Sequence, residues 1–251
     1  MSTKFKPLLA LFILLMVATP THADNINVAV ASNFSHTLQM LAGDFKEKTG
    51  HQLRISSAST GKLYTQINHG APFDIFMSAD EDRPDRLIAE GKASAELSRV
   101  YAIGRLVLIS NIKAKKTCQN VLDSPALKKF AIANPKTAPY GLAAQQTLEK
   151  LQRWQTLKSK LVMGENIAQT LQFVATANAG AGFIAQSMLR QGAKINLACE
   201  WEVPVDMHDP IKQKMLVLTK ASNKPAVIAF WHYMQTDTAK TIIKNSGYDA
   251  P

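Results

Sequence analysis

The chain reads Ile26-Asn27-Val28-Ala29-Val30-Ala31-Ser32-Asn33-Phe34 close to its N-terminus. The first five of these residues are typical of a buried β-strand, and the small residues Ala31, Ser32 and Asn33 follow. Leu38, Leu41 and Phe45 then recur at helical spacing as far as Gly50, a residue type that often ends helices. Strand, polar turn and helix in this order are the unit from which α/β proteins are built.

The same alternation of strands and amphipathic helices continues along the chain, so we expect an α/β fold. Neither an internal repeat nor a Pro/Gly/Ser-rich linker interrupts it. The further strands that we predict lie at residues 53–55, 74–77, 106–109, 130–133, 183–184 and 215–218. The further helices lie at residues 62–68, at 141–157, after Asn166, where Gln169 stands at capping-box spacing, and from Pro225 onward.

The first 23 residues predict a secretory signal peptide. Lys4 and Lys6 precede an apolar run from Leu8 to Ala18, and small residues lead up to Ala23. The apolar run is too short to span a bilayer, which takes about 20 residues. We therefore expect cleavage after Ala23 and a mature protein in the periplasm, without a lipid anchor because no cysteine lies near the cleavage point.

Positive charge is spread along the whole chain. The sequence has 29 Lys and Arg residues against 19 Asp and Glu residues, a formal net charge of +10, with no block of five or six like charges. This distribution favours a mild attraction for anions over a nucleic-acid interface. We expect no nucleic-acid partner.

The chain has two cysteines, Cys118 and Cys199. An oxidising compartment favours one disulfide between them, and two buried, unpaired thiols are the alternative. Neither cysteine has a His or Cys neighbour at metal-ligand spacing, so we expect no zinc site.

Three segments share an order that suits anion binding: the end of a strand, small hydroxyl or amide residues, and the start of a helix. Helix N-termini have unpaired backbone N–H groups and a partial positive charge, so three of them facing one cleft could bind an anion without Lys or Arg. Ordinary helix caps use the same residue types, so one segment by itself indicates little. The segments are Ala31-Ser32-Asn33-Phe34, Ser57-Ala58-Ser59-Thr60-Gly61 and Glu165-Asn166-Ile167-Ala168.

These segments closely resemble the periplasmic molybdate-binding proteins, and the similarity spans nearly all of the expected mature chain in the family's order. The stretch from Gly61 through Asp80 is the most specific part of the resemblance. The other matching stretches are Tyr101-Ala102-Ile103-Gly104, Ala138-Pro139-Tyr140-Gly141-Leu142-Ala143 and Glu165-Asn166-Ile167.

The resemblance implies the two-lobed fold of periplasmic binding proteins, in which each lobe is a mixed sheet flanked by helices. The chain would cross twice between the lobes, and the lobes would close on the ligand like a hinge. Residues 24–103 and 207–251 would form lobe one, and residues 104–206 would form lobe two.

The resemblance also implies the residues that bind the ligand. Ser32 and Thr60 would donate through their hydroxyls and backbone N–H groups. Asn33 would donate its backbone N–H, with its side chain as a further candidate donor. Tyr140 and Ile167 would donate backbone N–H groups from lobe two.

This sequence departs from some family members at two positions. Thr60 stands where serine is common, which keeps the hydroxyl. Ala185 stands where some members have a tyrosine that reaches the ligand, so that donor is missing here.

The implied ligand is molybdate or tungstate, and the donor set suits that chemistry. Both are fully deprotonated dianions near neutral pH and need only donors, whereas phosphate keeps a proton and favours a carboxylate acceptor. Molybdenum would be bound only as the oxyanion, through the same residues, and no cofactor is expected. Sulfate has the same charge and shape, so a binding protein for another tetrahedral oxyanion such as sulfate is the alternative.

The implied partner is the permease of an inner-membrane ABC importer, and we expect the binding protein to be a monomer. An enzyme is the main alternative class, but the six His residues are scattered, and no G-x-S-x-G elbow, H-E-x-x-H motif or P-loop occurs. Ferric or polyamine sites would need clustered tyrosines or converging carboxylates, which the three segments lack. We therefore expect a binding protein and not an enzyme.

Overall fold

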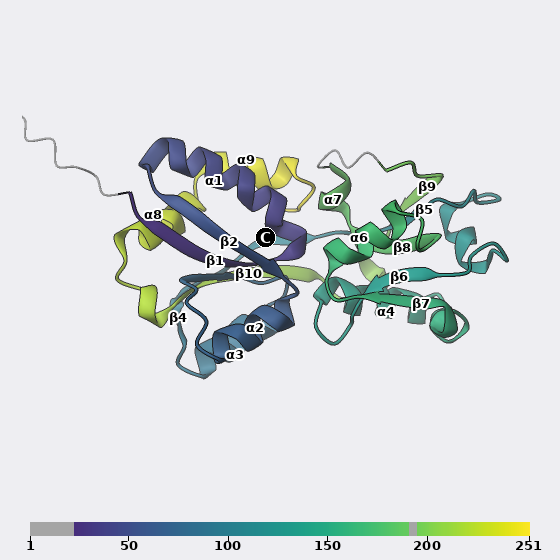
Figure 1. Cartoon of the computed structure of the whole chain (residues 1–251), viewed down its shortest axis with the longest axis horizontal. Coiled ribbons are helices and arrows are strands. Elements are labelled where there is room, and N and C mark those ends of the chain that lie inside the picture. The colour runs from purple at the N-terminus through teal and green to yellow at the C-terminus, as the bar shows by residue number, and fades with distance from the viewer. Residues whose placement is uncertain (1–22, 191–194) are drawn as a thin grey trace, which may run out of the picture.

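The computed structural model describes residues 23–190 and 195–251, so the predicted signal peptide lies outside the described residues apart from Ala23. Two lobes lie side by side along the long axis, and each is built on a five-stranded mixed sheet flanked by helices (Figure 1). The described part of the chain contains no helix that is long and apolar enough to cross a membrane.

The sheet of lobe one has the strand order β2-β1-β3-β10-β4. Strand β1 runs parallel to β2 and β3, whereas β10 is antiparallel to both of its neighbours, β3 and β4. The strands are β1 (Asn25–Ala31), β2 (Gln52–Ala58), β3 (Ile75–Met77), β4 (Ala93–Gly104) and β10 (Ile211–Leu218).

The sheet of lobe two has the strand order β7-β6-β8-β5-β9. Strand β6 is parallel to β7 and β8, and β5 is antiparallel to β8. The strands are β5 (Leu106–Ser110), β6 (Phe130–Ala133), β7 (Leu161–Gly164), β8 (Ala181–Ala185) and β9 (Cys199–Glu202).

Helices cover both faces of each sheet. They are α1 (Ser35–Thr49), α2 (Thr60–Asn68), α3 (Asp82–Ala89), α4 (Pro139–Lys150), α5 (Trp154–Leu157), α6 (Ile167–Ala175), α7 (Gln186–Arg190), α8 (Pro225–Tyr233) and α9 (Asp237–Asn245). Short 3₁₀ turns are η1 (Ser32–Phe34), η2 (Cys118–Asp123), η3 (Lys158–Lys160), η4 (Val205–Met207) and η5 (Thr219–Ala221).

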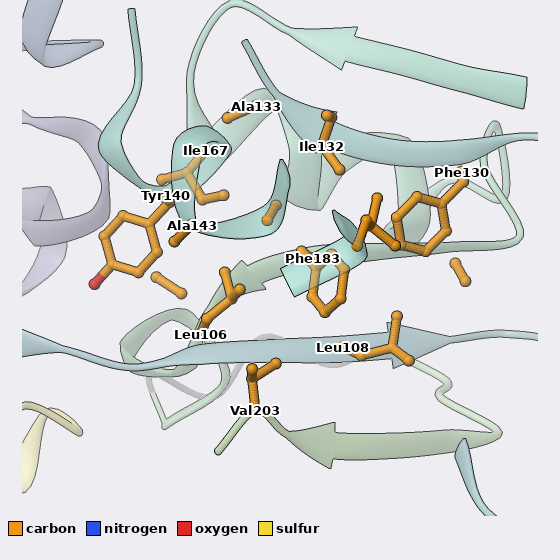
Figure 2. Packing of buried hydrophobic residues seen from close by; sticks show 14 of the residues in the cluster. Leu106, Leu108, Phe130, Ile132, Ala133, Tyr140, Ala143, Ile167, Phe183 and Val203 are labelled. Carbon is orange, nitrogen blue, oxygen red and sulfur yellow. The ribbon is translucent and has the colours of Figure 1, made fainter. Parts of the chain in front are cut away.

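Alternate residues of the strands point to opposite faces and so build two apolar layers in each lobe. In lobe one, Val28 of β1 packs with α1, α8 and α9, whereas Ala29 packs with Leu63 of α2 and Leu87 of α3. In lobe two, Leu106, Leu108, Phe130 and Phe183 form a core with residues of α4, as Figure 2 shows.

Two crossings join the lobes. The first lies where β4 ends at Gly104 and β5 begins at Leu106, and the second lies between β9 and β10. The crossings run next to each other, because Ile211 of β10 pairs with Gly104 of β4.

The helix predicted from about Gly141 to Leu157 is wrong in its continuity, because the structure has two helices there, α4 and α5, with a break between them. The helix α4 begins at Pro139, whose fixed φ and missing N–H suit the first helical position, and it ends at Lys150. Gln152 has a φ of 58°, in the left-handed region, so the chain leaves the helix before the separate helix α5 begins at Trp154. The edge strand β4 was not predicted, because its first part is half exposed and lacks a clear apolar alternation.

Cys118 and Cys199 form a disulfide in the structure, with their Cα atoms 5.6 Å apart. The bond ties the turn η2 to the edge strand β9 of lobe two.

Candidate functional site

A small cavity lies between the lobes, with a volume of about 10 Å³. A space of this size holds about one water molecule, so a tetrahedral oxyanion would enter only if the walls moved apart slightly. The five residues predicted to bind the oxyanion all line it. The complete lining is Ala31, Ser32, Asn33, Ser59, Thr60, Ala79, Ala138, Pro139, Tyr140 and Ile167.

The sheet register explains why residues far apart in the sequence meet here. Ala31 at the end of β1 pairs with Ala58 at the end of β2, and the chain then continues into Ser32 and Thr60, respectively. In lobe two, the ends of β6 and β7 pair in the same way and lead to α4 and α6. The cavity therefore lies outside the carboxyl ends of parallel strands from both lobes, where α/β proteins commonly bind ligands.

Three residues of lobe one that carry a hydroxyl line the cavity: Ser32, Ser59 and Thr60. Among the described residues, the Ser32 hydroxyl has no hydrogen-bond partner, and Ser32 begins the turn η1. Thr60 is the first residue of α2, and its Oγ1 accepts a hydrogen bond from the Ala79 N–H at 3.1 Å. Because a hydroxyl has one proton and two lone pairs, this contact orients the Thr60 hydroxyl and leaves its proton free to be donated.

Lobe two offers backbone N–H groups at two helix starts. In α4, Pro139 has no N–H, so Tyr140 carries the first N–H of the helix. In α6, the Asn166 side chain accepts from the Gln169 N–H at 3.0 Å, which leaves the N–H of Ile167 uncapped. In a standard capping box, the Gln169 side chain would accept from the N–H of the cap residue Asn166. Here it accepts from the N–H of the preceding residue, Glu165, at 2.7 Å.

The Asn33 side chain is not a free donor, in contrast to its expected role as a further candidate donor. Its Nδ2 donates to Gln213 Oε1 at 2.8 Å and to the Tyr248 hydroxyl at 3.0 Å, which uses both amide hydrogens. The backbone N–H of Asn33 is thus its candidate donor to the ligand.

The cavity is lined by small apolar residues and by hydroxyl and amide residues, without a charged side chain. Its lining contains neither a basic nor an acidic side chain, so backbone N–H groups and hydroxyls are what it offers to a ligand. No carboxylate is present to accept a proton from hydrogen phosphate. Within residues 23–190 and 195–251, no three His, Cys, Asp or Glu residues gather as ligands for a metal cation. The arrangement therefore favours a fully deprotonated anion.

Hydrogen bonds across the cleft hold the lobes together beside the cavity. The Gly61 N–H of α2 donates to the Thr137 carbonyl at 2.9 Å. Arg83, which forms an ion pair with Asp80, donates to the Lys136 carbonyl at 3.0 Å. These contacts join lobe one to the loop that leads into α4, so the structure shows a closed cleft.

Substitution of Gly61 by alanine is expected to weaken ligand binding severalfold without lowering the thermal stability of the ligand-free protein. A Cβ at Gly61 would lie 3.1 Å from the Thr137 Cα, so it would press against the opposite lobe only when the cleft is closed. Calorimetric titration and thermal unfolding measure the two effects. Gly43→Ala is the control, because a Cβ there meets nothing within 4 Å. Equal affinities of the two variants would contradict this role of Gly61.

Several site residues were not identified individually from the sequence. Ala79 and Ala138 line the cavity, but alanine carries no chemical signal, and Ala79 matters through its N–H to Thr60. Gln213 lies behind the cavity in a strand, and its link to Asn33 spans 180 residues. Only the tertiary structure brings these residues together.

Comparisons with known proteins agree with this geometry. The family described as bacterial extracellular solute-binding protein matches residues 26–249. The molybdate-binding protein ModA of Azotobacter vinelandii is 42% identical over 234 residues, which cover 93% of each chain. The ModA protein of Rhodobacter capsulatus is 38% identical over 241 residues, covering 95% of this chain and 94% of the relative.

The fold is also similar to a solved structure. The periplasmic molybdate-binding protein of Azotobacter vinelandii matches with a TM-score of 0.84 and 36% identity, over 90% of this chain and 99% of that one. A two-lobed architecture, a donor-lined interlobe cavity and a family match over residues 26–249 agree with one another. The chain belongs to the bacterial extracellular solute-binding proteins, and as such it is a binding protein and not an enzyme.

Proposed function

We propose that this protein captures molybdate, and also tungstate, in the cavity between its lobes and delivers it to an ABC importer. The observation that carries the proposal is the cavity itself, where residues from both lobes present donors and no carboxylate. The similarity to two molybdate-binding proteins over more than nine-tenths of the chain supports the same ligand.

The proposed ligand set is Ser32, Asn33, Thr60, Tyr140 and Ile167, which bind the four oxygens and not the metal atom. Hydrogen bonds to charged groups contribute about 1.5–3 kcal/mol each. About half a dozen of them, set against an association cost of about 4–15 kcal/mol, leave room for micromolar binding or better, near −8 kcal/mol. No cofactor takes part.

We also propose where the protein acts, which partner it has and how its chain divides into lobes. After cleavage behind Ala23, the monomeric protein acts in the periplasm, and an inner-membrane permease accepts its closed, loaded form. One lobe consists of residues 24–103 and 207–251, the other consists of residues 104–206, and the hinge lies between them. The two adjacent crossings beside Gly104 and Ile211 support that division.

Calorimetric titration of the mature protein with molybdate, tungstate, sulfate and phosphate tests the ligand. We expect tight one-to-one binding of molybdate and tungstate and no heat from sulfate or phosphate. Binding of sulfate alone would mean that the ligand is this smaller oxyanion and not molybdate. The site would still be one that only donates hydrogen bonds. No binding of any of the four anions would overturn the proposed function.

A further inference from the structure

A buried polar cluster lies behind the cavity, and Gln213 is at its centre. Gln213 belongs to β10, two residues from the pair Ile211–Gly104 at which the chain crosses between the lobes. Its side chain is completely buried and is not part of the cavity lining. A buried amide requires hydrogen-bond partners, and these partners show what Gln213 does.

The Gln213 amide joins residues of both lobes. Its Oε1 accepts from the Asn33 Nδ2 at 2.8 Å and from the Tyr101 hydroxyl at 3.1 Å, both in lobe one. Its Nε2 donates to the Tyr140 hydroxyl in lobe two at 3.2 Å. Figure 2 shows Tyr140 at the edge of the lobe-two core, with its hydroxyl pointing away from that core.

We propose that Gln213 is a positioning residue for oxyanion binding, which holds Asn33 of lobe one and Tyr140 of lobe two so that their backbone N–H groups face the same ligand. This inference rests on the proposed function. Gln213 does not touch the ligand; it fixes two residues that do.

An amide is the side chain that this position requires. It accepts hydrogen bonds at one end and donates at the other, which an aliphatic side chain or a carboxylate cannot do. Burial raises the pKa of the Tyr101 and Tyr140 hydroxyls well above their usual value, so both stay protonated at neutral pH. Burial likewise raises the pKa of the Tyr248 hydroxyl, which donates to the Asn33 carbonyl at 2.8 Å.

The backbone beside Gln213 is shaped to admit this contact. A Cβ on Gly104 would lie 2.1 Å from the Tyr140 hydroxyl oxygen and 2.9 Å from the Gln213 Nε2. Glycine at the crossing therefore leaves the space in which the side chains of β10 and α4 meet. The link between the lobes is built at the hinge itself.

Gln213→Glu and Gln213→Met test the proposal by calorimetric titration with molybdate at pH 8 and pH 6. At pH 8 the carboxylate places a negative charge near a dianion, and it can bind Tyr140 only by accepting the tyrosine proton, so we expect about a 100-fold loss of affinity. Burial raises the pKa of a carboxyl group, and the protonated acid again has one donor and one acceptor. We therefore expect the ratio of wild-type affinity to Gln213→Glu affinity to fall at least about tenfold between pH 8 and pH 6.

The methionine variant has no titrating group, so its loss of about tenfold should be the same at both pH values. Gln52→Glu is the matched control, because Gln52 is exposed on the same sheet and pairs with Asn25 at the opposite end of β1. Its affinity should equal that of the wild type. Wild-type affinity of Gln213→Glu at pH 8, or an equal loss at both pH values, would overturn the proposal.

Circular dichroism shows whether the variants fold. If neither Gln213 variant folds, Tyr140→Phe replaces them, since it breaks the same link from lobe two and keeps the ring. A severalfold loss of affinity in that variant supports the proposal, and unchanged affinity overturns it. The wild-type titration separates the two hypotheses. If the wild type binds no molybdate, both the proposed function and this inference are wrong. If the wild type binds molybdate and the variants bind it equally well, only the inference is wrong.

Discussion

Alanine at both Ser32 and Thr60 is expected to weaken molybdate binding about 100-fold, because each hydroxyl bond to a charged ligand contributes at least about 1.5 kcal/mol. The two hydroxyls lie in the cavity on neighbouring strand ends, and neither donates its proton to another described residue. Loss of the Thr60 hydroxyl also removes the acceptor of the Ala79 N–H, which adds to the effect. Calorimetric titration of the double variant measures the affinity.

The control for this pair is Ser56→Ala with Thr241→Ala, which removes two exposed hydroxyls of lobe one outside the cavity. Its affinity should equal that of the wild type, and both double variants should unfold cooperatively at similar temperatures. Unchanged affinity in the Ser32/Thr60 variant would mean that the ligand binds elsewhere.

Serine at both Cys118 and Cys199 is expected to lower the free energy of unfolding by about 4 kcal/mol. The disulfide joins residues 81 positions apart and thereby restricts the unfolded chain. Denaturant unfolding of the double variant and of the oxidised wild type measures the difference. A reductant should destabilise the wild type and leave the double variant unchanged.

A stability loss below about 1 kcal/mol would contradict this role of the disulfide. So would alkylation of both cysteines in the denatured, unreduced protein. The bond lies between η2 and β9, whereas the cavity lies at the ends of β1, β2, β6 and β7. We therefore expect the double variant to keep its affinity for molybdate under conditions in which it is folded.

The alternation of strands and helices was predictable where apolar periodicity is strong. The strand at residues 130–133 agrees with β6 in both bounds, and Asn166 caps α6 as its spacing to Gln169 predicts. Helix ends depend on weaker signals. After the break that follows Lys150, Gln152 adopts a left-handed conformation, which is uncommon for a residue other than glycine.

Which donors this protein could offer was readable from short stretches of its sequence. Ser32, Thr60 and Ile167 directly follow strands or begin helices, and capping chemistry depends on residues only a few positions apart. The resemblance of those segments to the periplasmic molybdate-binding proteins added the expectation that they would meet in one cleft.

The tertiary structure alone decided which of these groups are free to bind a ligand. The Asn33 amide is occupied by Gln213, 180 residues away, and the Thr60 hydroxyl is oriented by Ala79, 19 residues away. Such pairings depend on strand register and on how the two lobes meet at the crossings. Those are sums over many weak contacts between distant residues, and no local stretch of sequence contains them.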